Sequence, residues 1–256
     1  MPSLSVVVPC YNEEGSLEWF IPQVAAEAGG FSDFELIIVD DASTDRSPQI
    51  IASLAPRFGI RVISNPVNLG LGGAMRRGFD AARMEWLTYF PADGQVPAEE
   101  VRKFAPLMAG HDLIIGRRHS APDYTAYRRL ASRVYTKWVS LAFGLRLRDF
   151  NWMQAWRRSL WTQYGSRSSS VFICAEFLVR SQRAHPRMVE IEIAYRARRA
   201  GRAKNGSPSA ALKAAADIVR VFGEETLAGH LGFLHPRSPD VAVADADART
   251  SRGAAA

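Results

Sequence analysis

Short apolar runs alternate with amphipathic segments along the first half of the chain. The apolar runs cover residues 4–9, 34–39, 60–63, 86–90 and 112–116, and their lengths are typical of buried strands. Between them, apolar spacing and capping residues indicate one helix that begins at Asn12 or Ser16 and runs to about residue 27. Further helices are indicated over about 47–54, from the glycine-rich segment near residue 70 to about 83, and over 98–108. Strands and helices that alternate in this way predict an α/β fold with a parallel sheet.

The second half of the chain favours helices. Apolar residues at helical spacing predict one helix over 124–144 and another over 168–183, whereas the alternation over 188–195 predicts a strand. Residues 209–223 form an Ala-rich amphipathic pattern with Leu212, Ala215, Val219 and Phe222 on one face. We expect this apolar face, and Leu227 beyond it, to pack against the sheet; contact with a membrane interface is the alternative. From about residue 236 the composition predicts disorder.

The composition excludes several classes of protein. A 256-residue chain with 47% hydrophobic residues can bury a sizeable core. It contains neither a run of about 18 apolar residues nor a signal-peptide pattern, so we expect no membrane-spanning helix and no secretory leader. Cys10 and Cys174 fit no disulfide framework or metal spacing, which favours reduced thiols in a cytosolic protein.

The net charge of +6 is unevenly distributed. Residues 117–204 contain 19 Lys and Arg but only 5 Asp and Glu. This excess favours an anionic partner, such as a phosphate-bearing substrate or a membrane surface, although an ordinary solvated surface is the alternative. The basic residues form no recognisable nucleic-acid-binding motif, so no nucleic-acid partner is expected.

Polar residues follow four of the predicted strands, at the point where each strand ends. They are Asn12-Glu13-Glu14, Asp40-Asp41, Asn65 with Asn68 and Gly70, and Asp93 with Gln95. The carboxyl ends of parallel strands meet at one edge of a sheet, where ligands bind. We therefore expect these four groups to lie together at a binding site.

The glycine-rich segment 68–75 does not match a dinucleotide-binding fingerprint. The third glycine of that fingerprint is replaced by Met75, and the segment follows the third strand rather than the first. We therefore expect no Rossmann cofactor. The glycines allow a ligand to approach the backbone closely, and tight packing of the following helix on the sheet is an equal alternative.

The four polar groups resemble the successive motifs of family-2 glycosyltransferases of the GT-A fold. The resemblance lies in residues 7–14 (VVPCYNEE), 38–45 (IVDDASTD), 68–74 (NLGLGGA) and 92–95 (ADGQ). In the second half, residues 115–118, 128–129, 147–149, 175–180 and 195–204 resemble the polyprenyl-phosphate branch, which includes dolichol-phosphate mannose synthase-like enzymes. The similarity covers about residues 4–222.

The resemblance implies an open, mostly parallel GT-A-type sheet flanked by helices, with a C-terminal amphipathic helical extension. We expect a domain over residues 1–225, in which 1–116 bind a nucleotide sugar and 117–225 bind the acceptor, followed by an extension over 226–256. The implied activity is inverting transfer of a hexose from a nucleoside diphosphate sugar to a polyprenyl phosphate. The enzyme would then act in the cytoplasm, as a peripheral protein at the inner face of the cell membrane.

The resemblance also assigns site residues. The nucleotide sugar would contact Pro9, Tyr11, Glu13, Asp40, Asp41, Asn68, Gly70 and Asp93. Asp93 and Gln95 would hold Mg²⁺ or Mn²⁺ on the donor diphosphate. Arg117, Arg129, Arg198 and Lys204 would bind the acceptor phosphate. The residues implied in catalysis are Asp93, Arg117, Arg129 and Asp149.

The chain departs from the family pattern at three places. Pro91 stands where a second metal-binding Asp is usual, so we expect weaker metal binding. We do not expect its complete loss, because Mg²⁺ needs only one or two protein carboxylates. Residues 201–204 (GRAK) replace Gly-x-Ser-Lys, and Trp152-Met153 replace Gly-Phe. These two changes leave the identity of the acceptor open.

Three functions therefore remain. A polyprenyl phosphate has a second pKa of about 6, so it is largely dianionic at neutral pH and needs no general base. A sugar hydroxyl acceptor would need one, and Asp149 is the first candidate, although an ion pair with Arg146 or Arg148 is equally expected there. The third possibility is a non-catalytic nucleotide-sugar-binding module that lost its metal site at Pro91. Glu176 is interpreted as a structural partner of a buried arginine.

Overall fold

The computed structural model describes residues 2–118, 126–145, 147–199, 208–228 and 242–243. Their strands form an 8-stranded sheet in the order β3-β2-β1-β4-β6-β5-β7-β8. The strands are β1 (Leu4–Cys10), β2 (Phe34–Asp40), β3 (Arg61–Ser64), β4 (Trp86–Tyr89), β5 (Leu113–Arg118), β6 (Gln154–Arg157), β7 (Met188–Ile193) and β8 (Ala242–Val243). Among these strands only β6 runs antiparallel to its neighbours. The predicted α/β fold with an open, mostly parallel sheet is confirmed.

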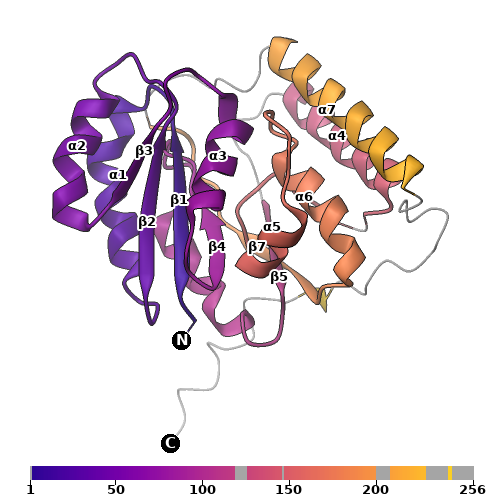
Figure 1. The fold of residues 1–256 in the computed structure, drawn as a ribbon, viewed down its shortest axis with the longest axis horizontal. Helices are drawn as coiled ribbons and strands as arrows, with labels where there is room; N and C mark the ends of the chain where they lie inside the picture. Colours follow the sequence, from indigo (N-terminus) through magenta and orange to yellow (C-terminus); the bar gives the residue numbers. More distant parts are fainter. Residues whose placement is uncertain (1, 119–125, 146, 200–207, 229–241, 244–256) are drawn as a thin grey trace, which may run out of the picture.

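Helices cover both faces of the sheet (Figure 1). The α-helices are α1 (Glu14–Ala28), α2 (Ser47–Phe58), α3 (Gly70–Ala81), α4 (Ala126–Phe143), α5 (Arg158–Tyr164), α6 (Ile173–Ser181) and α7 (Pro208–Leu227). The 3₁₀ turns are η1 (Ala98–Lys103), η2 (Ala105–Leu107) and η3 (Gln182–Ala184). One core lies between the sheet and α1, α2 and η1, and the other lies between the sheet and α3 to α6.

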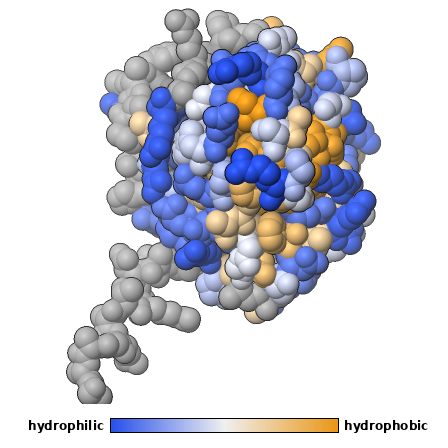
Figure 2. All heavy atoms as spheres, turned by 90° about the vertical axis from the view of Figure 1, so that its left-hand side faces the viewer, coloured by the Kyte–Doolittle hydropathy of each residue, from blue (hydrophilic) through white to orange (hydrophobic). Residues whose placement is uncertain are grey.

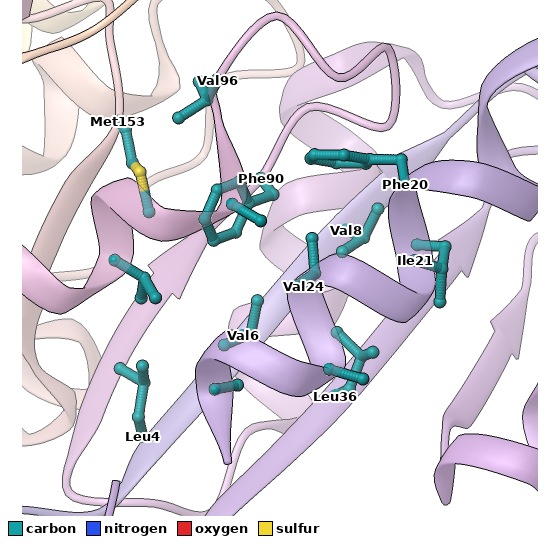
Figure 3. Packing of buried hydrophobic residues seen from close by; sticks show 14 of the residues in the cluster. Leu4, Val6, Val8, Phe20, Ile21, Val24, Leu36, Phe90, Val96 and Met153 are labelled. Atoms are coloured by element: carbon teal, nitrogen blue, oxygen red, sulfur yellow. The ribbon is translucent and has the colours of Figure 1, made fainter. Parts of the chain in front are cut away.

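The central strand β1 is buried on both faces. Its Val6 and Val8 pack with Phe20 and Val24 of α1 in the first core (Figure 3), whereas Val7 belongs to the second core. Successive side chains of a strand point to opposite faces, so a strand covered on both sides needs apolar residues at every position. This explains why β1 appears in the sequence as a continuous apolar run.

Three sequence predictions about secondary structure were wrong. Residues 98–108 form the 3₁₀ turns η1 and η2 rather than one helix. The helix expected over 168–183 begins only at Ile173, and Ser169 before it accepts a hydrogen bond from the amide of Gly72 at 3.1 Å. Strand β6 was not expected; it inserts between β4 and β5, and Thr88 of β4 donates a side-chain hydrogen bond to the Gln154 carbonyl at 2.7 Å.

The glycines of α3 provide close packing within the chain. A Cβ atom on Gly72 would lie 2.6 Å from main-chain atoms of Ser169 and Ser170. A Cβ atom on Gly78 would collide with the side chain of Val7 in β1. Both positions therefore agree with the packing alternative for the glycine-rich segment.

The apolar stripes of α4 and α7 do not pack against the sheet, contrary to the expectation for α7. The two helices contact each other and lie side by side (Figure 1). Their exposed apolar residues are Leu130, Val134, Trp138 and Leu141 on α4 and Leu212, Val219, Phe222 and Leu227 on α7. The side of α7 that faces the protein carries the buried residues Ala214, Val221 and Glu225 instead. In the described part of the chain, no helix has both the length and the apolar character to cross a membrane.

Edge strand β3 and helix α2 lie at the other end of the molecule from α4 and α7. Figure 2 shows hydrophilic residues around a hydrophobic area on that face. The expected disorder beyond residue 236 falls outside the described residues, apart from Ala242 and Val243, which pair with β7. The proposed division between residues 116 and 117 falls within β5 and stays a prediction.

Candidate active site

The polar residues that follow β1, β2, β3 and β4 meet at the carboxyl edge of the sheet, as the sequence predicts. Asn12 adopts a left-handed backbone conformation with a φ of 51°, which Asn tolerates better than most residues. Its side-chain oxygen accepts a hydrogen bond from the amide of Thr44 at 2.7 Å. The amide of Glu13 donates to the hydroxyl of Ser47 at 2.9 Å. The turn after β1 is thereby joined to the loop after β2.

Asp41 joins the loop after β2 to the start of α3. Its carboxylate accepts hydrogen bonds from the Asn65 side chain at 2.7 Å and from the amides of Leu69 at 2.8 Å and Gly70 at 2.9 Å. Asn68 donates to the Asp41 carbonyl at 3.2 Å. A carboxylate at a helix N-terminus satisfies amides that have no partner within the helix and interacts well with the helix dipole. In this structure Asp41 orders the glycine-rich segment; contact with the base or ribose stays a prediction.

Asp40 lies beside a buried thiol. The Asp40 carboxylate accepts a hydrogen bond from the amide of Ser43 at 3.2 Å. Burial and the charge of Asp40 raise the pKa of Cys10 to about 12. The thiol therefore stays protonated at neutral pH and is not a nucleophile at this edge.

Asp93 lies on a tight turn just after β4. Its Oδ1 accepts a hydrogen bond from the amide of Gln95 at 3.0 Å, and the side chain is only 10% exposed. Gly94 between them has a φ of 67°, and a Cβ atom there would collide with the ring of Trp19 on α1. Glycine is therefore needed to bring the Asp93 turn against α1.

Arg198 bridges two carboxylates at this edge. Its Nη2 lies 2.6 Å from Oδ2 of Asp93, and its Nη1 lies 3.1 Å and 3.0 Å from the two carboxylate oxygens of Glu13. The three side chains are between 10% and 16% exposed. Arg198 was predicted to bind the acceptor phosphate; in this structure its guanidinium is held by the two acidic residues predicted to serve the donor.

The segment that carries Arg198 lies over the Asp93 turn. We call residues 195–199 the strap. The side-chain amide of Gln95 donates to the Tyr195 hydroxyl at 2.5 Å, and the backbone carbonyl of Gln95 accepts from the amide of Arg196 at 2.8 Å. The guanidinium of Arg199 stacks 4.5 Å from the ring centroid of Trp19. The contributions of Tyr195 and Trp19 were not predicted.

The residues predicted for the acceptor side form ion pairs. Arg117 lies 2.5 Å from Glu192, and Arg118 lies 2.8 Å from Asp149. The ion pair expected for Asp149 is present, but its partner among the described residues is Arg118, which the sequence prediction did not consider; Arg146 and Lys204 lie outside the described residues. The guanidinium of Arg118 also stacks 5.3 Å from the ring centroid of Trp152.

Aromatic contacts connect this acceptor side with the Asp93 turn. The rings of Trp152 and Tyr195 have centroids 5.3 Å apart, and Tyr195 binds Gln95. Trp152, which the sequence marked only as a departure from the family pattern, thus lies between the Asp149–Arg118 pair and the strap. The two halves of the predicted site are therefore adjacent in the fold.

A groove of about 370 Å³ lies between α4 and the segment that contains Asp149. It is lined by Ser132, Arg133, Thr136, Lys137, Ser140, Leu147, Arg148 and Asp149. Arg129 is exposed on α4, one turn before Arg133. The prediction missed Arg133 and Lys137, although their steps of four residues after Arg129 place all three on one face of the helix.

Glu176 has the structural role expected of it. Its carboxylate is completely buried and accepts hydrogen bonds from Arg180 at 2.9 Å, Arg220 at 3.1 Å and the amide of Ser168 at 2.8 Å. Burial alone would raise the pKa of Glu176, but the hydrogen bonds from Arg220, Ser168 and Ser166 lower it to about 2. The network links α6 and α7 to the loop that packs on α3.

The donor atoms near Asp93 suit a hard divalent cation. In the described residues, no three His, Cys, Asp or Glu side chains form a ready metal site. Nevertheless, Asp93 and Glu13 converge on one guanidinium, and Gln95, whose side-chain nitrogen binds Tyr195, lies on the same turn as Asp93 and carries a further oxygen donor. Mg²⁺ prefers such oxygen ligands and completes its shell with phosphate oxygens and water.

Comparison with known proteins identifies relatives. The family model described as glycosyl transferase family 2 matches residues 5–170. An undecaprenyl-phosphate 4-deoxy-4-formamido-L-arabinose transferase from Aeromonas hydrophila is 31% identical over 211 residues, which are 79% of this chain and 63% of the relative. A protein of the same name from Pseudomonas paraeruginosa is 33% identical over 61% of this chain and 48% of the relative. The chain thus spans less than two thirds of the length of these relatives.

Solved structures share the fold. Glucosyl-3-phosphoglycerate synthase from Mycobacterium tuberculosis, in complex with Mn²⁺, UDP-glucose and phosphoglyceric acid, has a TM-score of 0.66 and 20% sequence identity. The similarity covers 87% of this chain and 80% of that one. It supports the predicted GT-A fold, and the family model covers more than half of the sequence. The chain belongs to glycosyl transferase family 2.

Proposed function

We propose that the protein transfers a sugar, with inversion, from a nucleoside diphosphate sugar to a polyprenyl phosphate. The observation that carries this proposal is the arrangement at the carboxyl edge of the sheet, where Asp93 and Glu13 face Arg198 beside the basic second half of the chain. Such an arrangement suits two phosphate-bearing substrates. The relatives named as undecaprenyl-phosphate transferases support the choice of acceptor.

The donor would bind along the ends of β1, β2 and β4. Asp41 holds the start of α3 in place, so that the backbone beside the nucleotide is ordered before the donor arrives. Asp93 and Gln95 would hold Mg²⁺ or Mn²⁺, which supplies positive charge opposite the departing diphosphate. Arg117 and Arg198 would add positive charge to the same region, where negative charge accumulates as the sugar leaves.

The acceptor would enter by the groove between α4 and Asp149. Arg133, Lys137 and Arg148 line this groove and favour an anionic head group. A phosphate dianion can attack the sugar without a general base, and Asp149 already receives a hydrogen bond from Arg118. We therefore assign Asp149 to the positioning of Arg118 rather than to proton transfer.

The exposed stripes of α4 and α7 would bring the enzyme to its lipid substrate. Trp138 and Leu141 on α4 are each 68% exposed, and Leu212 on α7 is 73% exposed. Exposed Lys and Arg residues lie on the same helices, including Arg129 and Lys213. Apolar residues combined with basic ones are typical of helices that lie in the interface of an anionic membrane. We place the enzyme at the cytoplasmic face of the cell membrane, as a peripheral protein.

A donor screen tests this function. The protein is incubated with undecaprenyl phosphate, Mg²⁺ or Mn²⁺ and a panel of nucleoside diphosphate sugars, and the lipid is analysed by mass spectrometry. A lipid phosphate that carries one sugar is expected, and Asp93→Ala should abolish it. Asp33→Ala, which removes an exposed carboxylate next to the first residue of β1, is the matched control and should retain activity. Glycosylation of saccharide hydroxyls without any lipid product would contradict the proposal.

A further inference from the structure

Arg198 lies between two carboxylates, at a position that requires a positive charge. Two carboxylates that approach each other in a largely buried site repel, unless a positive group lies between them. Arg198 supplies that group, with one nitrogen 2.6 Å from Asp93 and the other 3.0 Å from Glu13. The Arg198 guanidinium thus occupies the position between the two carboxylates at which a cation would bind.

Arg198 and a metal ion would compete for the same atom. Oδ1 of Asp93 accepts the amide of Gln95, whereas Oδ2 is the oxygen that binds Arg198. A cation bound through Oδ2 would have to displace the guanidinium. Breaking a buried ion pair is costly when it leaves a charge unpaired, but the exchange of one cation for another leaves neither carboxylate unpaired.

We propose that Arg198 occupies the cation position in the free protein and leaves it when the donor and its metal ion bind. Asp93 would then hold the metal ion, and the guanidinium of Arg198 would move to pair with the donor diphosphate. This inference rests on the proposed function, because it requires a donor that carries a diphosphate. Arg198 is thereby a binding residue for the donor as well as a stand-in for its metal ion.

The strap is held in a way that allows this exchange. Its contacts include a hydrogen bond of Tyr195 and a backbone hydrogen bond of Arg196 to Gln95, an ion pair of Arg196 with Glu99, and the ring contacts of Tyr195 with Trp152 and of Arg199 with Trp19. The ion pair of Arg196 is about half exposed at both side chains. The Arg196–Glu99 pair therefore contributes little. The Arg198 side chain belongs to neither core, so it can leave Asp93 without loss of the sheet or the cores.

The exchange couples the metal ion to the nucleotide. Without a diphosphate, a metal ion must displace Arg198 into a position that offers it no anion. With a diphosphate, Arg198 gains a new anionic partner. Each ligand should therefore raise the affinity for the other by the same factor, as linkage requires.

Mn²⁺ binding to the free protein tests the proposal without any measurement of activity. The electron paramagnetic resonance signal of free Mn²⁺ gives its affinity for the wild-type chain and for Arg198→Gln. We expect Arg198→Gln to bind Mn²⁺ at least about tenfold more tightly in the absence of nucleotide, equivalent to about 1.4 kcal/mol. Arg196→Gln removes a nearby arginine on the same strap and should leave the affinity unchanged. Addition of UDP should raise the Mn²⁺ affinity of the wild type more than that of Arg198→Gln.

The outcomes separate this inference from the function on which it rests. Equal or weaker Mn²⁺ binding by Arg198→Gln, while UDP binding is retained, would overturn the exchange and leave the proposed function intact. Absence of UDP binding in the wild type, with and without Mn²⁺, would overturn the function itself. Thermal unfolding shows whether each variant is folded. If Arg198→Gln does not fold, Arg198→Lys, which loses the forked contact with both carboxylates, is measured in the same way and should also bind Mn²⁺ more tightly.

Discussion

Replacement of Glu176 by Gln should destabilise the fold by an amount that depends on pH. The carboxylate of Glu176 is completely buried and is bound by Arg180 and Arg220 and by the amide of Ser168. Its pKa is lowered from 4.5 to about 2, which at about 1.4 kcal/mol per pKa unit corresponds to about 3 kcal/mol of stability. In Glu176→Gln this contribution is lost, and the two arginines also lose a buried anion.

The sign of the pH dependence follows from the lowered pKa. The unfolded chain binds the proton of Glu176 more tightly than the folded protein, so acid favours unfolding. The contribution of about 3 kcal/mol is therefore complete above about pH 5 and decreases as the pH falls from 4.5 towards 2. The difference in unfolding free energy between the wild type and Glu176→Gln should become smaller over the same range.

Urea denaturation, followed by circular dichroism at several pH values, measures this difference. Glu224→Gln is the matched control, because Glu224 binds the same two arginines but its side chain is 35% exposed. We expect Glu224→Gln to lower the unfolding free energy by less than about 1 kcal/mol, as for other partly exposed ion pairs. Equal effects of the two variants at pH 7, or an effect of Glu176→Gln that does not change with pH, would contradict this role of Glu176.

Three further predictions concern packing, catalysis and the membrane. Gly72→Ala should lower the free energy of unfolding by about 1–3 kcal/mol, because the new Cβ atom would meet main-chain atoms 2.6 Å away. Gly223→Ala is the control: its Cβ atom would enter open space, so the change should be neutral or stabilising. Urea denaturation measures both variants. Asp149→Asn should keep transfer to undecaprenyl phosphate within about tenfold, since only a hydroxyl acceptor needs a base there; a loss of about 10²–10⁴-fold in the lipid assay would contradict this. Trp138→Ser should weaken co-sedimentation with anionic liposomes at low salt, whereas Val62→Ser, a change of another exposed apolar residue on β3, should not.

The parallel half of the sheet could be predicted because its strands are buried on both faces. β1 and β2 are continuous apolar runs that end in polar residues, and both signals are local in the sequence. The sequence of β6 contains no such apolar run. It has only four residues, ends in Arg157 and is defined by its pairing with Leu87 and Leu113, which lie far away in the chain.

The orientation of α7 could not be read from its periodicity. An amphipathic pattern shows that a helix has an apolar face, but it does not show what covers that face. Here the stripe with Leu212 and Val219 is exposed, because the inner side of α7 carries Val221 of the second core together with charged contacts. Arg220 on that side binds Glu176, and Glu225 binds Arg183. These partners come from α6 and η3, so only the fold brings them together with α7.

The metal site, too, depends on residues that only the fold brings together. Within the motif that contains Asp93, Pro91 stands in place of a carboxylate that is usual in the family. The fold brings Glu13, from the turn after β1, to the guanidinium that also binds Asp93. Two negative charges are thus present at this position in spite of Pro91, one from each of two neighbouring strands. Because attraction for a cation depends on the number and distance of the charges rather than on their order in the chain, Pro91 alone is no argument for a protein that has lost its metal ion.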